Sequence, residues 1–246
     1  MKEQVTVLDN TFSASTPEGK GGENTASGNE KVILPFEFDR EYFVESLGEI
    51  PRKPFYSFNK RFFDIVISAI MLILLALPML AIAIAVRVTS HGPSIYSQER
   101  LGLGGRRFNI LKFRTMYDGA EEEGARWSDG DDDVRITRLG RFLRRSRLDE
   151  LPQLWCILRG SMTFVGPRPE RECFYREFER YIHGFSERLK VKPGLTGHAQ
   201  VNGGYDLKPQ EKILYDVEYI KKRSFLFDCR IVFQTVAVVF NHKGAK

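Results

Sequence analysis

The chain of 246 residues carries a formal net charge of +5, which favours an anionic partner such as membrane lipid, nucleotide or nucleic acid. Its length fits one domain with extensions rather than a series of domains. The three cysteines show no CxxC spacing, which argues against a disulfide framework and favours a reducing compartment.

The first part of the chain has the composition of a solvated extension. Residues 1–35 are rich in Gly, Ser, Thr, Glu and Asn and poor in apolar residues, so we expect a disordered tail. No basic start followed by an apolar core occurs there, so we expect no signal peptide. Residues 36–58 hold scattered aromatic residues and prolines and are expected to form a linker, or a short helix, that lies on an apolar surface.

An apolar segment follows the linker. Residues 65–86 contain no charged residue, and at about 1.5 Å per residue such a helix covers roughly 33 Å, enough for the hydrocarbon core of a bilayer. A buried helix of a soluble protein is the alternative interpretation. Because both flanks are basic and Pro78 should kink the helix, we expect residues 59–90 to form a re-entrant membrane helix with both ends on the cytoplasmic face. The sequence does not exclude a simple span.

Two alternating segments predict a β-hairpin. Residues 94–99 and 107–114 have the pattern of strands, and a Gly-rich turn joins them. Lys112 and Arg114 alternate with apolar neighbours, so both basic side chains should lie on one face of the second strand. The glycines of the turn match neither a GxGxxG motif nor a P-loop, so we assign them no nucleotide-binding role.

An acidic stretch follows the hairpin. Residues 118–133 contain DxD patterns at 129–131 and at 131–133, and such a pair can hold a metal ion against a nucleotide diphosphate. A solvated loop is the favoured alternative, because no strand leads into the stretch. Residues 135–147 then predict a short basic helix.

Asp149 and Glu150 follow a group of arginines and precede a helical pattern that starts at Leu151, with Pro152 tolerated in its first turn. Unpaired N–H groups and the helix dipole favour ionised carboxylates at such a position. Paired carboxylates beside cations suit a nucleophile, a metal ligand or a site for an anionic substrate. A helix cap with surface ion pairs explains the pattern equally well.

The C-terminal third contains further segments of interest. Arg168 lies between two prolines, which would hold its guanidinium rigidly toward an anion. Residues 170–190 have a charged helical pattern, and residues 192–204 form a Gly-rich polar loop typical of a site wall. His198 in this loop is a poor candidate metal ligand, because no second histidine is near it. Residues 224–240 predict a helix that lies either in the membrane interface or in the domain core.

Four strings occur in order along the chain: KFRTM at 112–116, LDELPQL at 148–154, VGPRP at 165–169, and KPGLTG at 192–197 followed by AQVNG at 199–203. Together with the proline-broken apolar segment, they closely resemble the bacterial sugar transferase family. These proteins are the monotopic phosphoglycosyl transferases that start glycan assembly on polyprenol phosphate. The resemblance covers about residues 59–240, and because no long multi-span region precedes it, we expect the minimal form with a single membrane segment.

The resemblance implies an α/β, helix-rich fold. It would consist of a compact cytosolic domain with a small β-hairpin, one re-entrant membrane helix and interfacial amphipathic helices. Residues 91–246 would form the catalytic domain and carry the C-terminal interfacial helices. The protein would lie at the bacterial inner (cytoplasmic) membrane, with its catalytic domain on the cytoplasmic face.

The resemblance also implies a reaction. A sugar-1-phosphate would pass from a UDP-sugar to undecaprenyl phosphate, with release of UMP, dependence on Mg²⁺ and a covalent aspartyl-phosphosugar intermediate. Asp149 would be the nucleophile, and both Asp149 and Glu150 would be catalytic and hold the metal. The substrate would be bound by Lys112, Arg114, Arg144, Arg168, Gln200 and Asn202. Such a reaction would initiate exopolysaccharide, capsule or glycan assembly. The partners would include membrane lipids but no nucleic acid, and a homo-oligomer is compatible with the sequence.

The chain departs from the family pattern in two places. The Ser-Pro pair at the helix break is Leu77-Pro78 here, so the hydroxyl that could satisfy a freed carbonyl is missing. Gly204 stands where many members have an arginine, which weakens one expected phosphate contact.

Two other functions remain open at this point. A non-enzymatic membrane-surface scaffold would explain the anchor and the basic charge, but not an Asp149–Glu150 pair beside cations. A metal-dependent nucleotide-sugar glycosyltransferase using Asp131 and Asp133 would release UDP rather than UMP.

Overall fold

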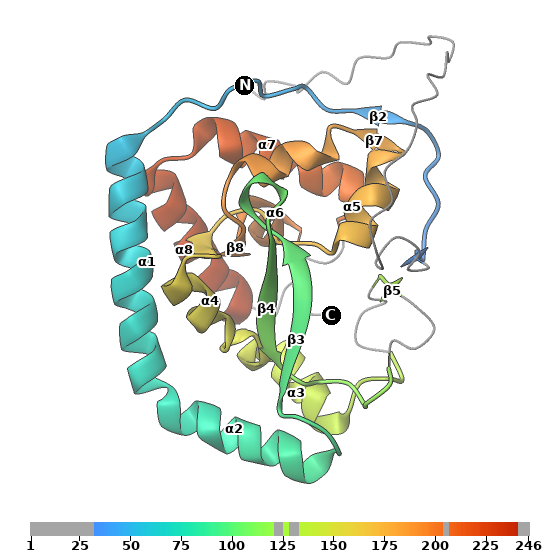
Figure 1. Ribbon diagram of the computed structural model, residues 1–246, viewed down its shortest axis with the longest axis vertical. Helices are drawn as coiled ribbons and strands as arrows, with labels where there is room; N and C mark the ends of the chain where they lie inside the picture. Colours follow the sequence, from blue (N-terminus) through green and yellow to red (C-terminus); the bar gives the residue numbers. More distant parts are fainter. Residues whose placement is uncertain (1–31, 121–124, 128–132, 204–206, 241–246) are drawn as a thin grey trace.

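A computed structural model describes residues 32–120, 125–127, 133–203 and 207–240, and helices predominate among them (Figure 1). The strands form four two-stranded sheets between the helices. The expected helix-rich fold with a small hairpin is therefore confirmed for the described part of the chain.

The apolar segment forms a bent pair of helices, α1 (Pro54–Leu74) and α2 (Ala76–Thr89), whose axes differ by 63°. Pro78 explains the bend, because it offers no N–H to the carbonyl of Leu74 and its ring crowds that carbonyl. The predicted kink is thus confirmed. The first helix begins at Pro54 rather than at residue 59, and proline is well suited to the first turn of a helix. No single described helix is long and apolar enough to cross a membrane, and only the bent pair passes that test of length and composition.

The hairpin consists of β3 (Ile95–Leu101) and β4 (Arg107–Phe113), which pair antiparallel. The turn between them contains η1 (Leu103–Gly105), where Gly104 has a φ of 65° that favours glycine. The hairpin is confirmed, with its second strand ending one residue before Arg114.

The C-terminal part of the chain builds the body of the domain. Its elements are α3 (Arg138–Arg145), η2 (Leu148–Glu150), α4 (Gln153–Arg159), β6 (Thr163–Val165), α5 (Glu172–Glu179), β7 (Ile182–His183), η3 (Phe185–Lys190), β8 (Gly194–Thr196), α6 (His198–Asn202), α7 (Pro209–Lys222) and α8 (Phe225–Phe240). The charged stretch 170–190 is not one helix, because α5 ends at Glu179, the chain pairs as β7, and Gly184 at a φ of 93° then leads into η3.

The segment before α1 lies along the body of the domain rather than apart from it (Figure 1). Two short strands, β1 (Val32–Ile33) and β2 (Tyr42–Phe43), pair in parallel with β5 (Ala125–Arg126) and β7. The stretch expected to be a disordered tail up to residue 35 thus includes a strand at its end. The physical reason is local hydrophobicity, because apolar side chains of this segment pack on a buried cluster.

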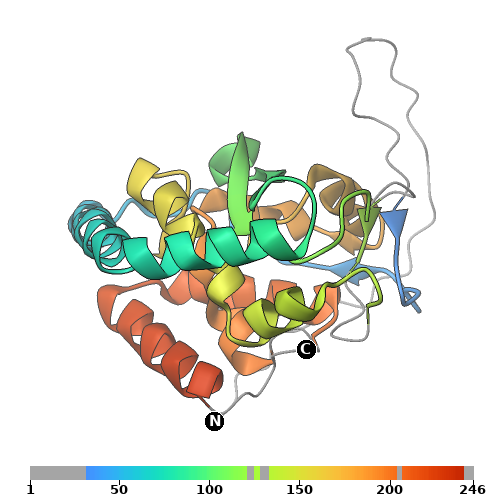
Figure 2. The same cartoon turned by 90° about the horizontal axis from the view of Figure 1, so that it is seen from below.

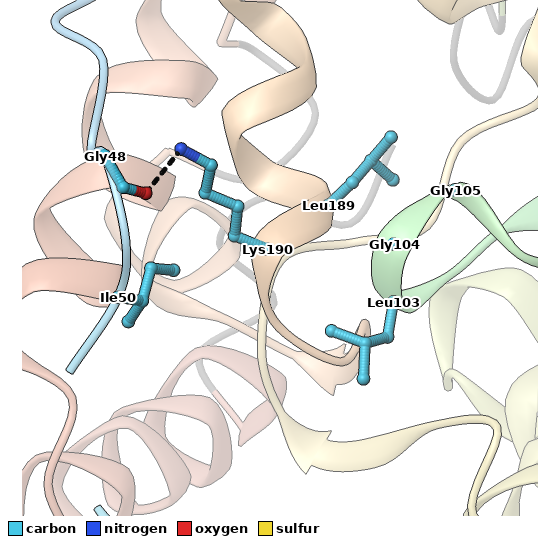
Figure 3. A pocket seen from close by; sticks show the side chains of 7 residues that line it. All are labelled: Gly48, Ile50, Leu103, Gly104, Gly105, Leu189 and Lys190. Carbon is cyan, nitrogen blue, oxygen red and sulfur yellow. Dashed lines mark hydrogen bonds between the residues drawn. The ribbon is translucent and has the colours of Figure 1, made fainter. Parts of the chain in front are cut away.

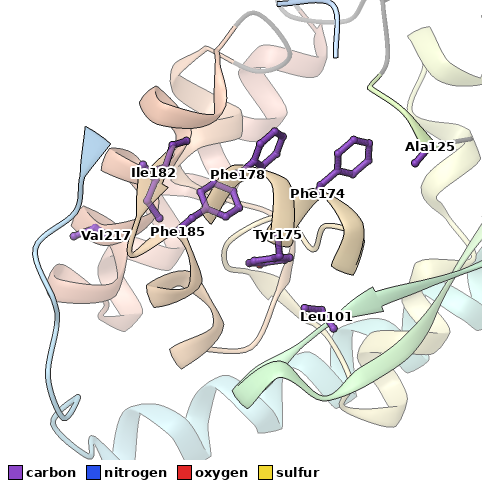
Figure 4. Close-up of a cluster of buried hydrophobic side chains, with 9 residues drawn as sticks. Leu101, Ala125, Phe174, Tyr175, Phe178, Ile182, Phe185 and Val217 are labelled. Carbon is purple, nitrogen blue, oxygen red and sulfur yellow. The ribbon is translucent and has the colours of Figure 1, made fainter. Parts of the chain in front are cut away.

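That buried cluster is centred on α5 and η3 (Figure 4). Phe174 and Phe178 stack at a centroid distance of 5.8 Å, and Phe178 meets Phe185 edge-on at 5.2 Å. Phe38 of the N-terminal segment packs edge-on against Phe178 at 6.1 Å. The aromatic residues of the predicted linker therefore extend the core of the domain.

Candidate active site

The two acidic residues of the LDELPQL string lie in η2, a single 3₁₀ turn that directly precedes α4. We predicted a helix starting at Leu151, whereas α4 begins at Gln153 with Pro152 as its N-cap. Proline lacks the N–H that would continue the helical ladder upstream, so the acids occupy a separate turn. Arg147 enters this turn with a φ of 58°, the one left-handed conformation outside glycine among the described residues. Such strain is found mostly where the surrounding structure enforces it, often at functional sites.

Both carboxylates are buried, with Asp149 at 6% and Glu150 at 8% relative exposure. The Glu150 Oε1 atom accepts a hydrogen bond from Arg168 Nη2 at 2.6 Å and lies 3.5 Å from Lys112 Nζ. The exposed cap with surface ion pairs that the sequence also allowed is therefore not what forms here.

The two neighbouring carboxyls have opposite pKa shifts. Burial alone would raise the pKa of Glu150, but the positive charges of Arg168 and Lys112 outweigh burial and bring this pKa below its ordinary value. For Asp149, burial and the negative charge of Glu150 raise the pKa, against the opposing charges of Lys112, Arg144 and Arg168. Glu150 is thus a fixed anion, and Asp149 is the more basic carboxylate.

Three of the predicted cations surround this pair, whereas Arg114 lies elsewhere. Arg144 is held by a hydrogen bond of 2.9 Å from its Nε to Thr115 Oγ1, and its charge acts on Asp149. Arg114 is buried, and its Nη2 donates to the carbonyl and hydroxyl oxygens of Ser90 at 2.8 Å each. Arg114 therefore ties the end of α2 to the hairpin and makes no hydrogen bond to the carboxylates.

The predicted residues of α6 differ in their placement. Gln200 donates to the Leu195 carbonyl at 3.0 Å and lines the same cavity as Glu150. Asn202 is exposed and donates to the His198 carbonyl at 2.7 Å, so it folds back on its own helix and is absent from the cavity wall. Gly204 lies outside the described residues.

The metal-binding capacity of the site is limited to two carboxylates. Within the described ranges, no three His, Cys, Asp or Glu side chains come together in a way that could hold a metal ion. Asp149 accepts no hydrogen bond from the described residues, so its oxygens are available for a cation, while Glu150 is shared with Arg168 and Lys112. Since Mg²⁺ is commonly held by one or two carboxylates completed by substrate phosphates, the donor set fits this ion.

The DxD patterns contribute nothing that can be placed at this site. Asp129, Asp131 and Asp132 lie outside the described residues. Asp133 is described, and its carboxylate is engaged by the guanidinium of Arg135 at 2.5 Å.

A cavity of about 690 Å³ opens beside the carboxylates, bounded by α1 on one side and α8 on the other. Glu150, Arg145 and Arg147 line it at the carboxylates, Lys60, Asp64 and Asp228 line it on α1 and α8, and most of the remaining wall is apolar. A second cavity of about 440 Å³ lies between the N-terminal segment and the hairpin turn, where Lys190 Nζ donates to the Gly48 carbonyl at 2.9 Å (Figure 3). Its one ionisable lining residue among those described, Lys190, is also paired with Glu187, and no described carboxylate lines this cavity, so the paired carboxylates belong to the first cavity.

Sequence reasoning missed the polar face of α1. Lys60, Asp64 and Ser68 recur at intervals of four, which places them on one face of the helix. Lys60 Nζ lies 2.6 Å from Asp228 of α8, and Asp64 accepts the backbone N–H of Phe164 at 3.1 Å. This spacing was visible in the sequence and could have indicated that α1 docks on the domain through polar contacts.

A neighbouring residue supports Arg168. Arg188 is buried and donates from Nη2 to the Arg168 carbonyl at 2.9 Å, while the same Nη2 atom lies 2.7 Å from Asp216. Burial opposes the charge of Arg188, but the Asp216 carboxylate together with Tyr175 and Glu170 outweighs burial and raises the pKa of Arg188. The backbone that presents Arg168 to Glu150 is thus held from α7 and η3.

The sequence pattern of the bacterial sugar transferases matches residues 55–242. The chain belongs to the bacterial sugar transferase family. All the site residues described above fall within the matched range.

Curated members of this sugar transferase family are similar over most of the chain. An Aeromonas hydrophila protein named UDP-N-acetylgalactosamine-undecaprenyl-phosphate N-acetylgalactosaminephosphotransferase is 40% identical over 203 residues, which is 81% of this chain and 48% of that protein. A UDP-glucose:undecaprenyl-phosphate glucose-1-phosphate transferase of Xanthomonas campestris is 40% identical over 80% of this chain and 42% of its own length. A protein of the same name from Caulobacter vibrioides is 40% identical over 77% of this chain and 72% of its own length. The chain thus spans about half the length of the first two relatives.

Proposed function

We propose that this protein transfers a sugar-1-phosphate from a UDP-sugar to undecaprenyl phosphate, giving undecaprenyl-diphosphate-sugar and UMP. The observation that carries the proposal is the buried Asp149–Glu150 pair facing Lys112, Arg144 and Arg168. A diphosphate donor and a phosphate acceptor both need such a concentration of positive charge. The names of the relatives, which refer to UDP-sugars and undecaprenyl phosphate, support the same substrates.

The reaction proceeds in two displacements at one phosphorus atom. An Asp149 carboxylate oxygen attacks the β-phosphorus of the UDP-sugar, and the bond from this phosphorus to the bridging oxygen breaks. The electron pair leaves with that oxygen on UMP, and an aspartyl-phosphosugar remains. A phosphate oxygen of undecaprenyl phosphate then attacks the same phosphorus, which forms the diphosphate and regenerates the Asp149 carboxylate.

The electrostatics of the pair suit this division of roles. Asp149 has the raised pKa of a more basic carboxylate, which makes it the better nucleophile of the two, while Glu150 is held by Arg168 and Lys112. Lys112 and Arg168 also balance charge that develops on the phosphoryl oxygens. Mg²⁺, held by Asp149 and Glu150 together with substrate phosphates, would polarise the diphosphate and neutralise the leaving UMP.

The same protein works at a membrane surface. Large apolar side chains are exposed on α1, α2 and α8, including Ile73, Leu77 and Leu226. We assign the bent α1–α2 pair to a re-entrant element and α8 to the membrane interface, with the carboxylates on the cytoplasmic side. A lipid acceptor then presents its phosphate at the level of the headgroups, where a domain lying on the bilayer can reach it.

The decisive experiment follows UMP release. Purified protein is incubated with undecaprenyl phosphate, Mg²⁺ and a panel of UDP-N-acetylgalactosamine, UDP-glucose and UDP-galactose. UMP release with one donor, together with a phosphosugar adduct in the intact mass that Asp149→Asn removes, is expected. Release of UDP would favour a glycosyltransferase instead, and absence of any product would favour a scaffold. Wild-type activity of Asp149→Asn would overturn the nucleophile.

A further inference from the structure

The wall of the cavity between α1 and α8 is mainly apolar and is exposed to solvent. Six of its lining residues are large, apolar and substantially exposed: Phe63, Ile67, Phe225, Val232, Phe233 and Val236. They come from the two helices that bound the cavity, and Figure 2 shows α8 slanting away from α1 and α2. A contiguous exposed apolar lining of this kind is costly in water and indicates a binding surface.

The cavity also has charged lining residues. Lys60 and Asp228 compensate each other as an ion pair at 2.6 Å between α1 and α8, with Asp64 nearby on α1, and the other charged residues lie at the reactive site. Glu150, Arg145 and Arg147 form this charged part, and Glu150 is in turn bound by Arg168. The floor between the charged part and the helices consists of apolar side chains such as Leu154 and Leu195. A ligand that fits this shape has an anionic head at the carboxylate site and a long apolar body between the helices.

We infer that the cavity, which we call the α1–α8 groove, holds the prenyl chain of the phosphorylated lipid acceptor. The inference rests on the proposed function, because that function supplies the acceptor. Its volume of about 690 Å³ lies in the range of specific ligand sites and accommodates the phosphate-proximal part of such a chain. The remainder of the chain continues into the bilayer that α1 and α8 contact.

Two other occupants match the groove less well. A UDP-sugar is polar over its whole length and gains nothing from the apolar walls of α1 and α8. The headgroup of an ordinary membrane lipid belongs at the outer edge of the domain, whereas the charged part of this groove lies at the buried Glu150. A prenyl phosphate satisfies both parts at once.

The first test fills the groove. Val232→Trp adds volume to the groove wall, and Leu226→Trp makes the same kind of change on the same helix at a residue that is 80% exposed and outside the groove. We expect Val232→Trp to raise KM for undecaprenyl phosphate about tenfold or more through lost apolar contact, with KM for the UDP-sugar unchanged. The Leu226→Trp variant should keep both constants. A rise in KM for the donor alone, or equal effects of the two variants, would overturn the inference.

A second test measures binding without turnover. Cys229 lines the groove and is a free thiol, so in a Cys156→Ala, Cys173→Ser background it reports occupancy through its rate of alkylation by N-ethylmaleimide. Farnesyl phosphate should slow this alkylation at least severalfold, whereas UDP-glucose should not. A matched protein with Leu226→Cys as its single thiol should show no protection.

The two tests separate the inference from the proposed function. Protection of Cys229 by farnesyl phosphate with no UMP release from any donor would support the assignment of the groove to the prenyl chain and contradict the proposed reaction. UMP release together with unprotected Cys229 and a harmless Val232→Trp would support the reaction and overturn the groove. Protection by UDP-glucose in place of farnesyl phosphate would assign the groove to the donor and so refute the inference.

Discussion

Asp149 and Glu150 are adjacent in the chain, yet they differ in their contacts with the surrounding cations. Arg168 and Lys112 bind Glu150 directly, so its negative charge is compensated where it lies. The charges of the same cations lower the pKa of Asp149 from longer range, but burial and the negative charge of Glu150 raise it above the ordinary value. The protein therefore tolerates at Asp149 a carboxylate whose charge is only partly compensated, which is the expected cost of a reactive group.

Removal of the Asp149 charge should therefore stabilise the fold. The folded state holds the proton of Asp149 more tightly than the unfolded chain does, so ionisation at neutral pH weakens folding, and this penalty disappears at pH below the ordinary pKa of about 4. We expect the Tm of Asp149→Asn to exceed that of the wild type at pH 7.5, with a gap that narrows as the pH falls toward 4.

Asp133→Asn provides a control of opposite sign. The hydrogen bond from Arg135 lowers the pKa of Asp133, so loss of this carboxylate should lower Tm at neutral pH. Thermal melts of the three proteins across this pH range make the comparison, and a lower Tm for Asp149→Asn at pH 7.5 would contradict the assignment.

Loss of Arg168 should cost stability as well as activity. Arg168→Ala leaves the buried Glu150 without its shortest hydrogen bond, and such a charged hydrogen bond contributes about 1.5–3 kcal/mol. Arg176→Ala removes an exposed ion pair with Glu172 and should change the free energy of unfolding by no more than about 0.5 kcal/mol. Denaturant titration of both variants measures the difference, and equal losses would show that Glu150 does not depend on Arg168.

At the scale of the elements, α1 fixes the helix that follows the carboxylates. Arg61 donates from Nη1 to the Ile157 carbonyl and from Nη2 to the Leu158 carbonyl, both at 2.7 Å. These carbonyls belong to the last turn of α4, where a cation also interacts favourably with the helix dipole. Gly160 ends α4 at a φ of 90°, and any side chain at this position would meet the Arg61 guanidinium at 3.1 Å. Helix α1 and the helix that follows the carboxylates are thus joined side to end.

Arg61→Ala should weaken the attachment of α1 to α4. Loss of two hydrogen bonds from a charged donor is expected to lower the free energy of unfolding by about 2 kcal/mol, and Arg61→Lys should restore part of that loss. Arg106 is an exposed arginine of the hairpin turn, and Arg106→Ala serves as the control with little effect. If the melts of Arg61→Ala and Arg106→Ala coincide, Arg61 does not anchor α4.

Local patterns in the sequence predicted the elements whose causes are local. The hairpin, the proline bend and the helices α3 and α4 follow from spacing and from single residues such as Pro78 and Gly104. The parallel pairing of β1 with β5 depends on partners far apart in the chain, which no spacing rule identifies. The spacing on α1 indicates a polar face, but it does not identify Phe164 as the partner of Asp64. At the site, the grouping of Lys112 and Arg168 with Glu150 was predicted through the family resemblance, whereas the diversion of Arg114 to Ser90 needed the three-dimensional structure.

At the scale of the whole molecule, the exposed apolar side chains of α1, α2 and α8 are the basis for the proposed contact with a bilayer. Basic residues precede the apolar segment at Lys60 and Arg61 and follow it at Arg87. Basic flanks favour the cytoplasmic side, and a bend of 63° allows the chain to return to the side from which it entered.

Single-cysteine labelling in intact cells should show both flanks on the cytoplasmic face. Ser57 is exposed in the first turn of α1, ahead of the apolar stretch, and Ser97 is exposed after α2; in a Cys-free background neither Ser57→Cys nor Ser97→Cys should react with an impermeant thiol reagent added outside. Pro78→Leu restores the missing N–H and should straighten the pair, which would expose Cys at position 57 to the reagent. Labelling at position 57 in the protein with Pro78 intact would instead establish a span.

The polar face of α1 binds α8 through Lys60 and Asp228, β6 through Asp64, and α4 through Arg61. Three such anchors hold the helix at one place on the domain, so we expect α1 and the two carboxylates to move as one rigid body. In the proposed membrane arrangement, the depth to which α1 and α2 enter the bilayer would then set the height of Asp149 above it. A thicker or thinner bilayer would tilt the entire protein, so the thickness of the membrane would decide whether Asp149 and the acceptor phosphate lie at the same height.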